Sequence, residues 1–170
     1  MAASSKPEQA NKFEVVTTAI IVNKAGEYLI LQRDPHKKRF PSRWTVPGGK
    51  LEVADFVNEP KETKEYWYNV LEKTLPREVR EEAGLKISNI RYVTSLATVH
   101  EDGAPSLVIS CLADLAGGKI VLQPGETVDY AWVDLKQAKK YDLIDGIYDE
   151  LVMAEYVRKG QAIKWQRFQK

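Results

Sequence analysis

The sequence predicts an α/β or α+β fold in which a mixed β-sheet lies between helices. Two runs rich in β-branched residues, 13–22 and 28–33, flank the turn sequence NKAGE and are typical of a strand hairpin. Helical patterns cover about 61–83 and 145–159, with further strand patterns between them. Strands, a helix, strands and a last helix, in that order, favour a mixed sheet flanked by helices.

The remaining elements are short or bounded by turn residues. WTVPGG (44–49) is expected to be a short strand broken by its proline and glycines. Because Pro76 is tolerated in a first helical turn, a fresh helical start near Thr74 is expected. Gly84 closes that helix, and Asp145 is a candidate N-cap for the last one. Later strands are expected at 87–100, 105–115, 118–122 and 130–135.

Length and composition favour one domain, residues 13–170, after a flexible tail at 1–12. A net charge of +1 gives no general attraction to nucleic acid or anionic lipid. No apolar segment approaches the roughly 18–20 residues that span a bilayer, and the N-terminus has no apolar signal sequence. The single cysteine, Cys111, is expected to be buried in a strand and cannot form an internal disulfide. These features predict a cytoplasmic protein.

The stretch REVREEAGL (77–85) places three glutamates where negative charge is unfavourable. Glu78, Glu81 and Glu82 lie just before Gly84, where a helix presents the negative end of its macrodipole. On a helical wheel Glu81 and Glu82 fall about 60° and 40° to either side of Glu78, so the carboxylates share one face. Such hard oxygen ligands suit a divalent cation. The alternative is a solvated helix face on which arginines pair with glutamates.

Upstream of this helix, PGGK (47–50) offers a glycine pair where backbone can approach a ligand closely. Together the two stretches resemble the box of the Nudix hydrolases, G-x5-E-x7-R-E-U-x-E-E-x-G-U, with U a bulky aliphatic residue. The resemblance covers about residues 13–159 and implies a MutT-like pyrophosphohydrolase with a Nudix-type α/β/α sandwich. The matching positions are Gly49, Arg77, Glu78, Val79, Glu81, Glu82, Gly84 and Leu85.

The spacing inside the box departs from the family pattern. Arg77 lies 28 positions after Gly49, where the pattern has 14, which indicates an insertion at about 53–73. The insertion is expected to be a loop plus a helical segment. Its aromatic residues, Tyr66, Trp67 and Tyr68, are expected to pack against the body; a pocket or partner surface is the alternative. Counting forward from Gly49 gives Asp55 as the first box acid and counting back from Arg77 gives Asn69; other candidates are Glu52, Glu62, Glu65 and Glu72.

The resemblance implies hydrolysis of a diphosphate linkage in a nucleoside diphosphate derivative, with Mg²⁺ or Mn²⁺. Expected substrates are a (d)NTP, ADP-ribose or a nucleotide sugar, with release of a nucleoside monophosphate or its equivalent. The implied metal ligands are Gly49, Glu78, Glu81 and Glu82. The implied catalytic residues are Glu81, Glu82 and Arg77, and the implied substrate-binding residues are Arg33, Lys50 and Glu126.

The function has one alternative from another class, a non-catalytic Nudix-fold module that binds or senses nucleotides. Such a module is expected to lose its metal-binding glutamates, which this sequence keeps. The expected partner is a small nucleotide, without membrane and without nucleic acid, and a homodimer is expected by family analogy only. Lys37 and Arg39 are expected to be solvated loop charges, and the C-terminal KWQRFQK is expected to be a strap that docks on the body.

Overall fold

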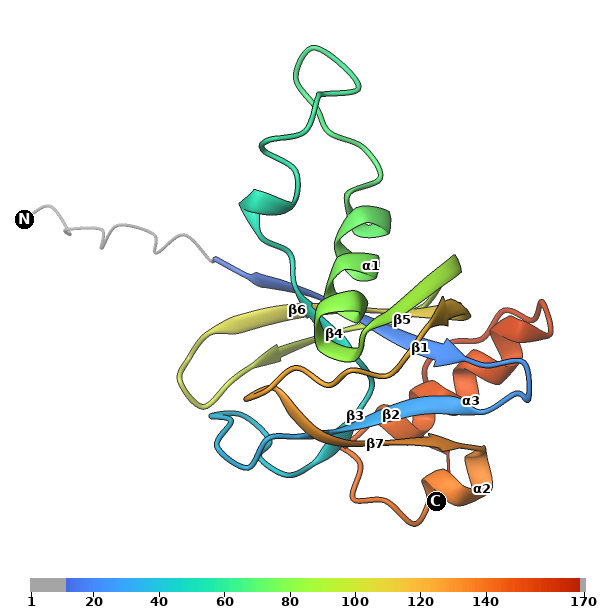
Figure 1. Cartoon of the computed structure of the whole chain (residues 1–170). Helices are drawn as coiled ribbons and strands as arrows, with labels where there is room; N and C mark the ends of the chain where they lie inside the picture. The colour runs from blue at the N-terminus through green and yellow to red at the C-terminus, as the bar shows by residue number, and fades with distance from the viewer. Residues whose placement is uncertain (1–11, 169–170) are drawn as a thin grey trace, which may run out of the picture.

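In the computed structural model, which describes residues 12–168, seven strands form one mixed sheet (Figure 1). The hydrogen-bonded order is β3-β2-β1-β6-β5, with β4 paired to β1 and β7 to β2. β1 and β6 are parallel, and the other pairs are antiparallel. The strands are β1 (Glu14–Val22), β2 (Tyr28–Arg33), β3 (Trp44–Thr45), β4 (Gly48–Lys50), β5 (Leu85–Val99), β6 (Pro105–Gly118) and β7 (Thr127–Val133).

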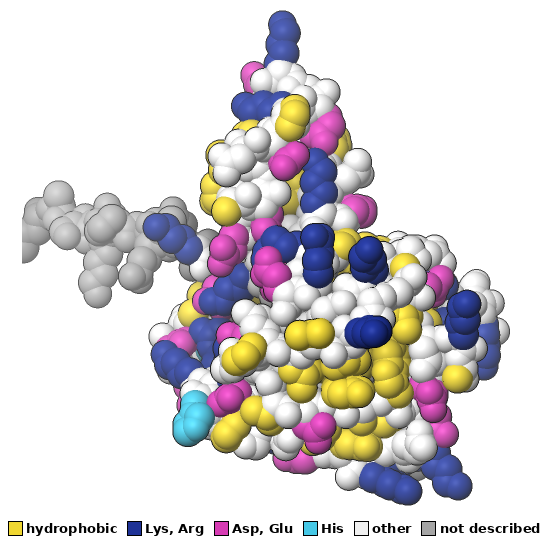
Figure 2. Space-filling view, viewed as in Figure 1, with side chains coloured by type: hydrophobic (Ala, Val, Ile, Leu, Met, Phe, Trp, Pro, Cys, Tyr) yellow, Lys and Arg dark blue, Asp and Glu magenta, His cyan; other side chains and the backbone are white. Residues whose placement is uncertain are grey.

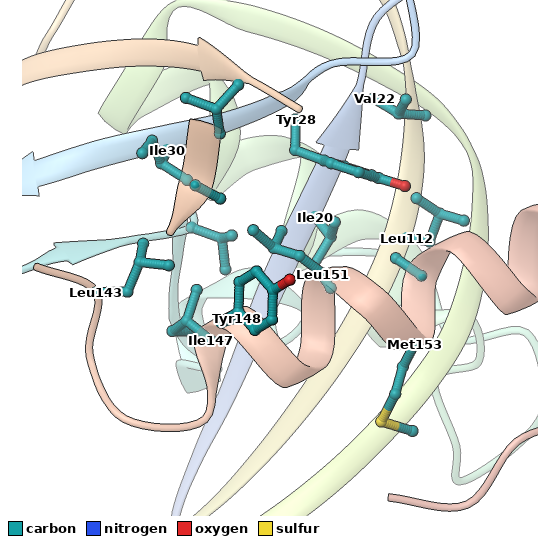
Figure 3. Packing of buried hydrophobic residues seen from close by; sticks show 14 of the residues in the cluster. Ile20, Val22, Tyr28, Ile30, Leu112, Leu143, Ile147, Tyr148, Leu151 and Met153 are labelled. Atoms are coloured by element: carbon teal, nitrogen blue, oxygen red, sulfur yellow. The ribbon is translucent and has the colours of Figure 1, made fainter. Parts of the chain in front are cut away.

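Helices cover both faces of this sheet, which confirms the predicted α/β/α arrangement. α1 (Val70–Ala83) lies on one face, and α3 (Ile147–Arg158) lies on the other with the short α2 (Leu135–Ala138). Successive side chains of a strand point to opposite faces. Ala19 and Ile21 of β1 therefore pack with α1, whereas Ile20 and Val22 pack with α3. Figure 3 shows the second of these cores, with Leu151 of α3 close to Ile20.

The predicted hairpin of β1 and β2 is confirmed only at its turn. The two strands pair at Val22 and Tyr28 and then separate. β4 pairs with β1 along Val16–Thr18, and β7 pairs with β2. The separation therefore brings the glycine-containing strand β4 alongside β1, next to the end of α1.

The expected fresh helical start near Thr74 is wrong, as is the helical segment at 61–69. α1 runs unbroken from Val70, with Asn69 in the left-handed conformation before it and Pro76 inside it. The exposed position of Glu72 explains why Pro76 is tolerated, because water can bond the carbonyl that the proline leaves without a donor. The preceding segment is charged and mostly exposed, so it has little apolar surface with which to stabilise a helix.

The inserted segment stands out from the body as an arm with mixed charges on its surface (Figures 1 and 2). Its contacts are largely internal. Phe56 and Trp67 pack with ring centroids 5.3 Å apart, and the Lys61 ammonium lies 4.5 Å from the centre of the Trp67 ring. Tyr66 and Tyr68 are 60% and 54% exposed, so the expected packing of these two residues against the body is wrong.

Two smaller expectations are wrong, and one short helix was not expected. Residues 118–122 do not continue as a strand, because the N–H groups of Val121 and Gln123 bond the last carbonyls of α1, those of Ala83 and Glu82. Gly146, not Asp145, is the N-cap of α3. No sequence pattern predicted the short α2, which Asp134 caps.

The C-terminal residues dock on α3, as expected for residues 164–168. The Phe168 ring stacks on Tyr156, and the Phe168 N–H donates to Asp149. Cys111 is buried in β6, also as expected. The predicted tail at 1–12 lies, except for residue 12, outside the described residues, as do residues 169–170 of the strap. Within residues 12–168 no helix is both long and apolar enough to cross a bilayer.

Candidate active site

A cleft of about 710 Å³ is lined by β1, β4, the last turns of α1 and the first turn of α3. It contains every residue that the sequence predicted for the site: Arg33, Gly49, Lys50, Arg77, Glu78, Glu81, Glu82 and Glu126.

Glu82 is the buried member of the α1 carboxylates, with 8% of its surface exposed. The backbone N–H of Gly48 donates a 2.9 Å hydrogen bond to its Oε2 atom. Burial nevertheless raises the pKa of Glu82 to about 7. The charged carboxylate loses its hydration in this position, and the Gly48 N–H and the positive charge of Arg33 compensate for only part of that loss. The folded chain therefore holds a carboxyl that can gain or lose a proton near neutral pH.

Glu78 explains why a glycine is needed at position 49 of β4. Its carboxylate lies against Gly49, where a Cβ atom would collide with it. A Cβ on Gly48 would instead collide with the Thr17 carbonyl of β1. Gly49 thus makes room for a helix side chain and Gly48 for a neighbouring strand. Burial raises the pKa of Glu78 as well.

Arg77 forms ion pairs with three acids of this region. Its guanidinium lies 2.7 Å from Glu78 and 2.9 Å from Glu81, and its Nε lies 2.6 Å from Oδ1 of Asp55 in an ion pair. Burial lowers the pKa of Arg77, but the facing carboxylates outweigh it and hold that pKa above its usual value. For Asp55, burial raises the pKa, and the bonds from Arg77 and the Glu52 N–H more than offset it.

The contact with Arg77 distinguishes Asp55 from the other candidates for the first box acid. The Asp55 carboxylate is 5% exposed and also accepts a bond from the Thr74 hydroxyl. Asn69 instead precedes α1 as its N-cap, and Glu62 of the arm pairs with Lys73 of α1. Counting forward from Gly49 therefore reaches the acid that meets the box arginine, and the extra residues lie between Asp55 and α1.

The donor set of α1 fits a hard divalent cation in chemical type. Arg77 bonds one oxygen each of Glu78 and Glu81, and Gly48 bonds one of Glu82, so each carboxylate keeps a second oxygen. In residues 12–168 no three acidic, histidine or cysteine side chains are already gathered as a metal cage. Ligation would require these carboxylates to converge, and the Glu81 side chain, 51% exposed, has room to rotate.

Two basic residues of the cleft, Arg39 and Lys50, pair with acids, whereas Arg33 donates from Nε to the Arg39 carbonyl at 3.1 Å. Arg39 donates to Glu14 at 2.8 Å and to Asp102 at 3.0 Å, and Lys50 donates to Glu14 at 2.7 Å. The bonds from Lys50 and then Arg39 lower the pKa of Glu14 to about 2. Lys37 pairs with Glu126. The expectation that Lys37 and Arg39 are solvated charges is therefore wrong, because loop 34–43 folds back over these acids.

Glu14 and Glu150 are among the acids of the cleft that sequence reasoning missed. Glu14 begins β1, and only the pairing of β1 with β4 and β6 brings it to the basic residues. Glu150 lies in the first turn of α3, an ordinary place for an acid. No local pattern distinguishes either residue, since the neighbours that matter are distant in sequence.

Comparison with known proteins agrees with this geometry. Residues 12–153 match the sequence model of the NUDIX domain. The chain belongs to the Nudix hydrolase family.

Curated relatives that match the chain carry the name NAD-capped RNA hydrolase NudC. The protein from Chromobacterium violaceum is 34% identical over 116 residues, covering 68% of this chain and 37% of that protein. The protein from Pectobacterium atrosepticum is 30% identical over 119 residues, covering 70% and 38%. The chain thus spans less than two fifths of the length of these curated relatives.

Solved structures show the same fold at low identity. The MutT protein of Methanosarcina mazei Go1 superposes with a TM-score of 0.65 at 21% identity, covering 88% of this chain and 98% of that one. The NUDIX domain of Shewanella oneidensis NrtR, solved with ADP ribose, gives 0.63 at 19% identity, covering 93% and 94%.

Proposed function

We propose that this protein is a divalent-metal-dependent hydrolase that cleaves the diphosphate linkage of a nucleoside diphosphate derivative. One observation carries the proposal: Glu78, Glu81 and Glu82 reach one cleft at the negative end of α1, against the glycine strand β4. That placement is electrostatically costly for a bare protein and favourable around a cation.

The residues divide the work in a way that follows from their contacts. Gly49, Glu78, Glu81 and Glu82 are the proposed metal site, where Mg²⁺ or Mn²⁺ would polarise phosphoryl oxygens and acidify a water molecule. Arg77 holds Glu78 and Glu81 in place through charge-assisted bonds. Glu82, whose carboxylate keeps one oxygen that does not bond Gly48, is the proposed acceptor of a proton from the attacking water.

The cleft lining contains basic residues that suit phosphate groups. Arg33 and Lys50 line the cleft, and Lys50 can exchange its bond to Glu14 for one to phosphate because its side chain is 54% exposed. Glu126 also lines the cleft, where it forms an ion pair with Lys37. We propose Arg33 and Lys50 as contacts to the substrate phosphates and Glu126 as a further substrate-binding residue.

The substrate is proposed to be a small molecule in which a pyrophosphate joins a nucleoside to a second group. The names of two relatives contain an NAD cap, and a structural neighbour was solved with ADP ribose. NAD and ADP-ribose both contain an adenosine diphosphate unit, so these belong beside (d)NTPs and nucleotide sugars among the candidates. The near-neutral net charge offers no general attraction for a long RNA chain.

The test is a substrate panel with Mg²⁺, Mn²⁺ or EDTA. The purified protein is incubated with ADP-ribose, NAD, nucleotide sugars and (d)NTPs, and released monophosphates are separated by ion-exchange chromatography. We expect a nucleoside monophosphate from at least one compound, and no release with EDTA. Full activity in EDTA would refute the metal mechanism, and no release from any compound would refute the hydrolase.

Metal binding has a second readout that does not need turnover. Mg²⁺ or Mn²⁺ should raise the melting temperature of the wild-type protein, because a ligand that binds only the folded state stabilises it. Glu82→Gln should abolish the shift. Glu72→Gln, at the other end of α1 and exposed, is the matched control and should keep it. A shift that survives in Glu82→Gln would place the metal elsewhere.

A further inference from the structure

Two consecutive acids of α3 are both buried but are compensated differently. Asp149 and Glu150 are 2% and 3% exposed. Asp149 pairs with the Arg167 guanidinium at 2.9 Å and accepts the Phe168 N–H. Glu150, which lines the cleft, pairs with no lysine or arginine among residues 12–168. A buried carboxylate without a cation is costly, so its position requires an explanation.

A chain of hydroxyl groups directs its protons toward Glu150. Thr18 Oγ1 donates to Ser110 Oγ at 3.0 Å, and Ser110 Oγ donates to Glu150 Oε2 at 2.7 Å. Within the described residues Ser110 supplies the one side-chain hydrogen bond to this carboxylate. Glu150 is therefore the final acceptor of the chain, and its Oε1 atom is available to a donor from the cleft.

The floor beside Glu150 is apolar. Val16, Val108 and Leu96 are paired neighbours on β1, β6 and β5, and all three line the cleft. Because directly paired residues point to the same face of a sheet, they form one row across three strands. Ile147 of α3 lines the cleft as well. A flat ring fits such a row, with its polar edge against Glu150.

This row adjoins the proposed phosphate site. On the other side of β1, Val16 pairs with Lys50 and Thr18 pairs with Gly48 of β4. The local strand order is thus β4-β1-β6-β5, with the glycine strand at one end and the apolar row across the rest. One ligand can reach from β4 to Glu150 by crossing β1.

We propose that Glu150 is a specificity-determining residue that accepts a hydrogen bond from the exocyclic amino group of the substrate's nucleobase, while the ring lies on Val16, Val108 and Leu96. The inference rests on the proposed function in taking a nucleotide as the ligand. The contact would select adenine or guanine over purines without an amino group, because an acceptor-only carboxylate repels a carbonyl oxygen in the same place.

The test compares nucleotides that differ by one amino group. Binding of AMP against purine riboside 5′-monophosphate, and of GMP against inosine 5′-monophosphate, is measured by calorimetry in Mg²⁺. Monophosphates contain no diphosphate linkage, so the result does not depend on hydrolysis. We expect the amino-bearing member of at least one pair to bind about 10-fold tighter to the wild-type protein, as for a hydrogen bond to a charged group.

Glu150→Gln should remove most of that difference, since its amide can turn a donor toward either base. Asp149→Asn, the buried neighbour paired with Arg167, is the matched control and should keep it. Equal binding within both pairs by the wild type would overturn the proposal, as would a difference that survives in Glu150→Gln. An equal loss in Asp149→Asn would also overturn it, because disturbance of α3 would then explain the effect.

Ser110→Ala tests the same contact if Glu150→Gln does not fold. It removes the donor that orients Glu150, so the discrimination should fall by a smaller factor, and an unchanged ratio would overturn the proposal. The two proposals fail separately. Discrimination without hydrolysis of any panel compound would leave the base site standing and refute the hydrolase; hydrolysis without discrimination would do the reverse.

Discussion

α1 and α3 each bring a buried glutamate to the same cleft, and the difference between them shows how to interpret such acids. Glu82 lies in the last turn of its helix beside two further glutamates, where the helix dipole opposes negative charge. Glu150 lies in the first turn of its helix, where the dipole favours it, and a hydroxyl donates to it. The first arrangement is the one for which we propose a cation, whereas the second takes neutral donors: the Ser110 hydroxyl and, in our proposal, an amino group of the substrate.

The largest expected effect comes from removing the α1 charge. Glu82→Gln should lower kcat by about 100-fold to 10,000-fold, as for loss of a group that handles the reaction's proton. Folding should be preserved, because the amide still accepts from Gly48 and no buried charge remains. Steady-state kinetics and thermal melting check both points. Retained activity would show that Glu82 of α1 has no catalytic role, and the proposed difference between the acids of α1 and α3 would be wrong.

Asp55→Asn tests whether the α1 site depends on the acid that meets Arg77. Loss of the charged partner should cost about 1–3 kcal/mol of unfolding free energy and lower kcat by roughly tenfold, because Arg77 would hold Glu78 and Glu81 less firmly. Urea denaturation and kinetics measure the two effects. Glu65→Gln, in the exposed part of the arm, is the control; a matching loss there would show that the arm as a whole, not Asp55, matters.

Substitutions of the two glycines of β4 should separate an effect on activity from an effect on stability. In Gly49→Ala the new Cβ displaces the flexible carboxylate of Glu78, so activity should fall several-fold with little change in melting temperature. In Gly48→Ala the Cβ meets the backbone of Thr17, which cannot move aside cheaply, so stability should fall by roughly 1–3 kcal/mol. Melting curves and kinetics of the two variants should diverge; identical behaviour would contradict the geometry.

The smallest expected effect is on the pH dependence of stability, and it comes from Glu150 of α3. Burial raises the pKa of Glu150 above the 4.5 of an exposed glutamate, so the folded state holds its proton more tightly than the unfolded state does. The stability of the wild type should therefore fall relative to Glu150→Gln as pH rises from 4.5 through the folded pKa. Thermal melting from pH 4 to 8 measures the difference, and an opposite trend would mean that Glu150 has a cation partner.

Much of the site could be predicted because its residues are local in sequence. Helical spacing alone places Glu78, Glu81 and Glu82 on one side of α1, and the glycine pair occurs in a single short stretch. The first box acid could not be chosen in this way. An arm of charged residues separates Asp55 from Arg77, and only the folded chain shows that the two side chains meet.

The amino-acid sequence by itself determined the order of the main strands and of the two long helices, the α1 acids and the family, because periodicity and short-range spacing act over a few residues. The tertiary structure decided which acids gain a distant partner. Glu150 finds Ser110 40 positions away, and Glu14 finds Ser106 92 positions away. Local propensity contains no information about such contacts. They form only when the strands pair and the helices pack on the two faces of the sheet.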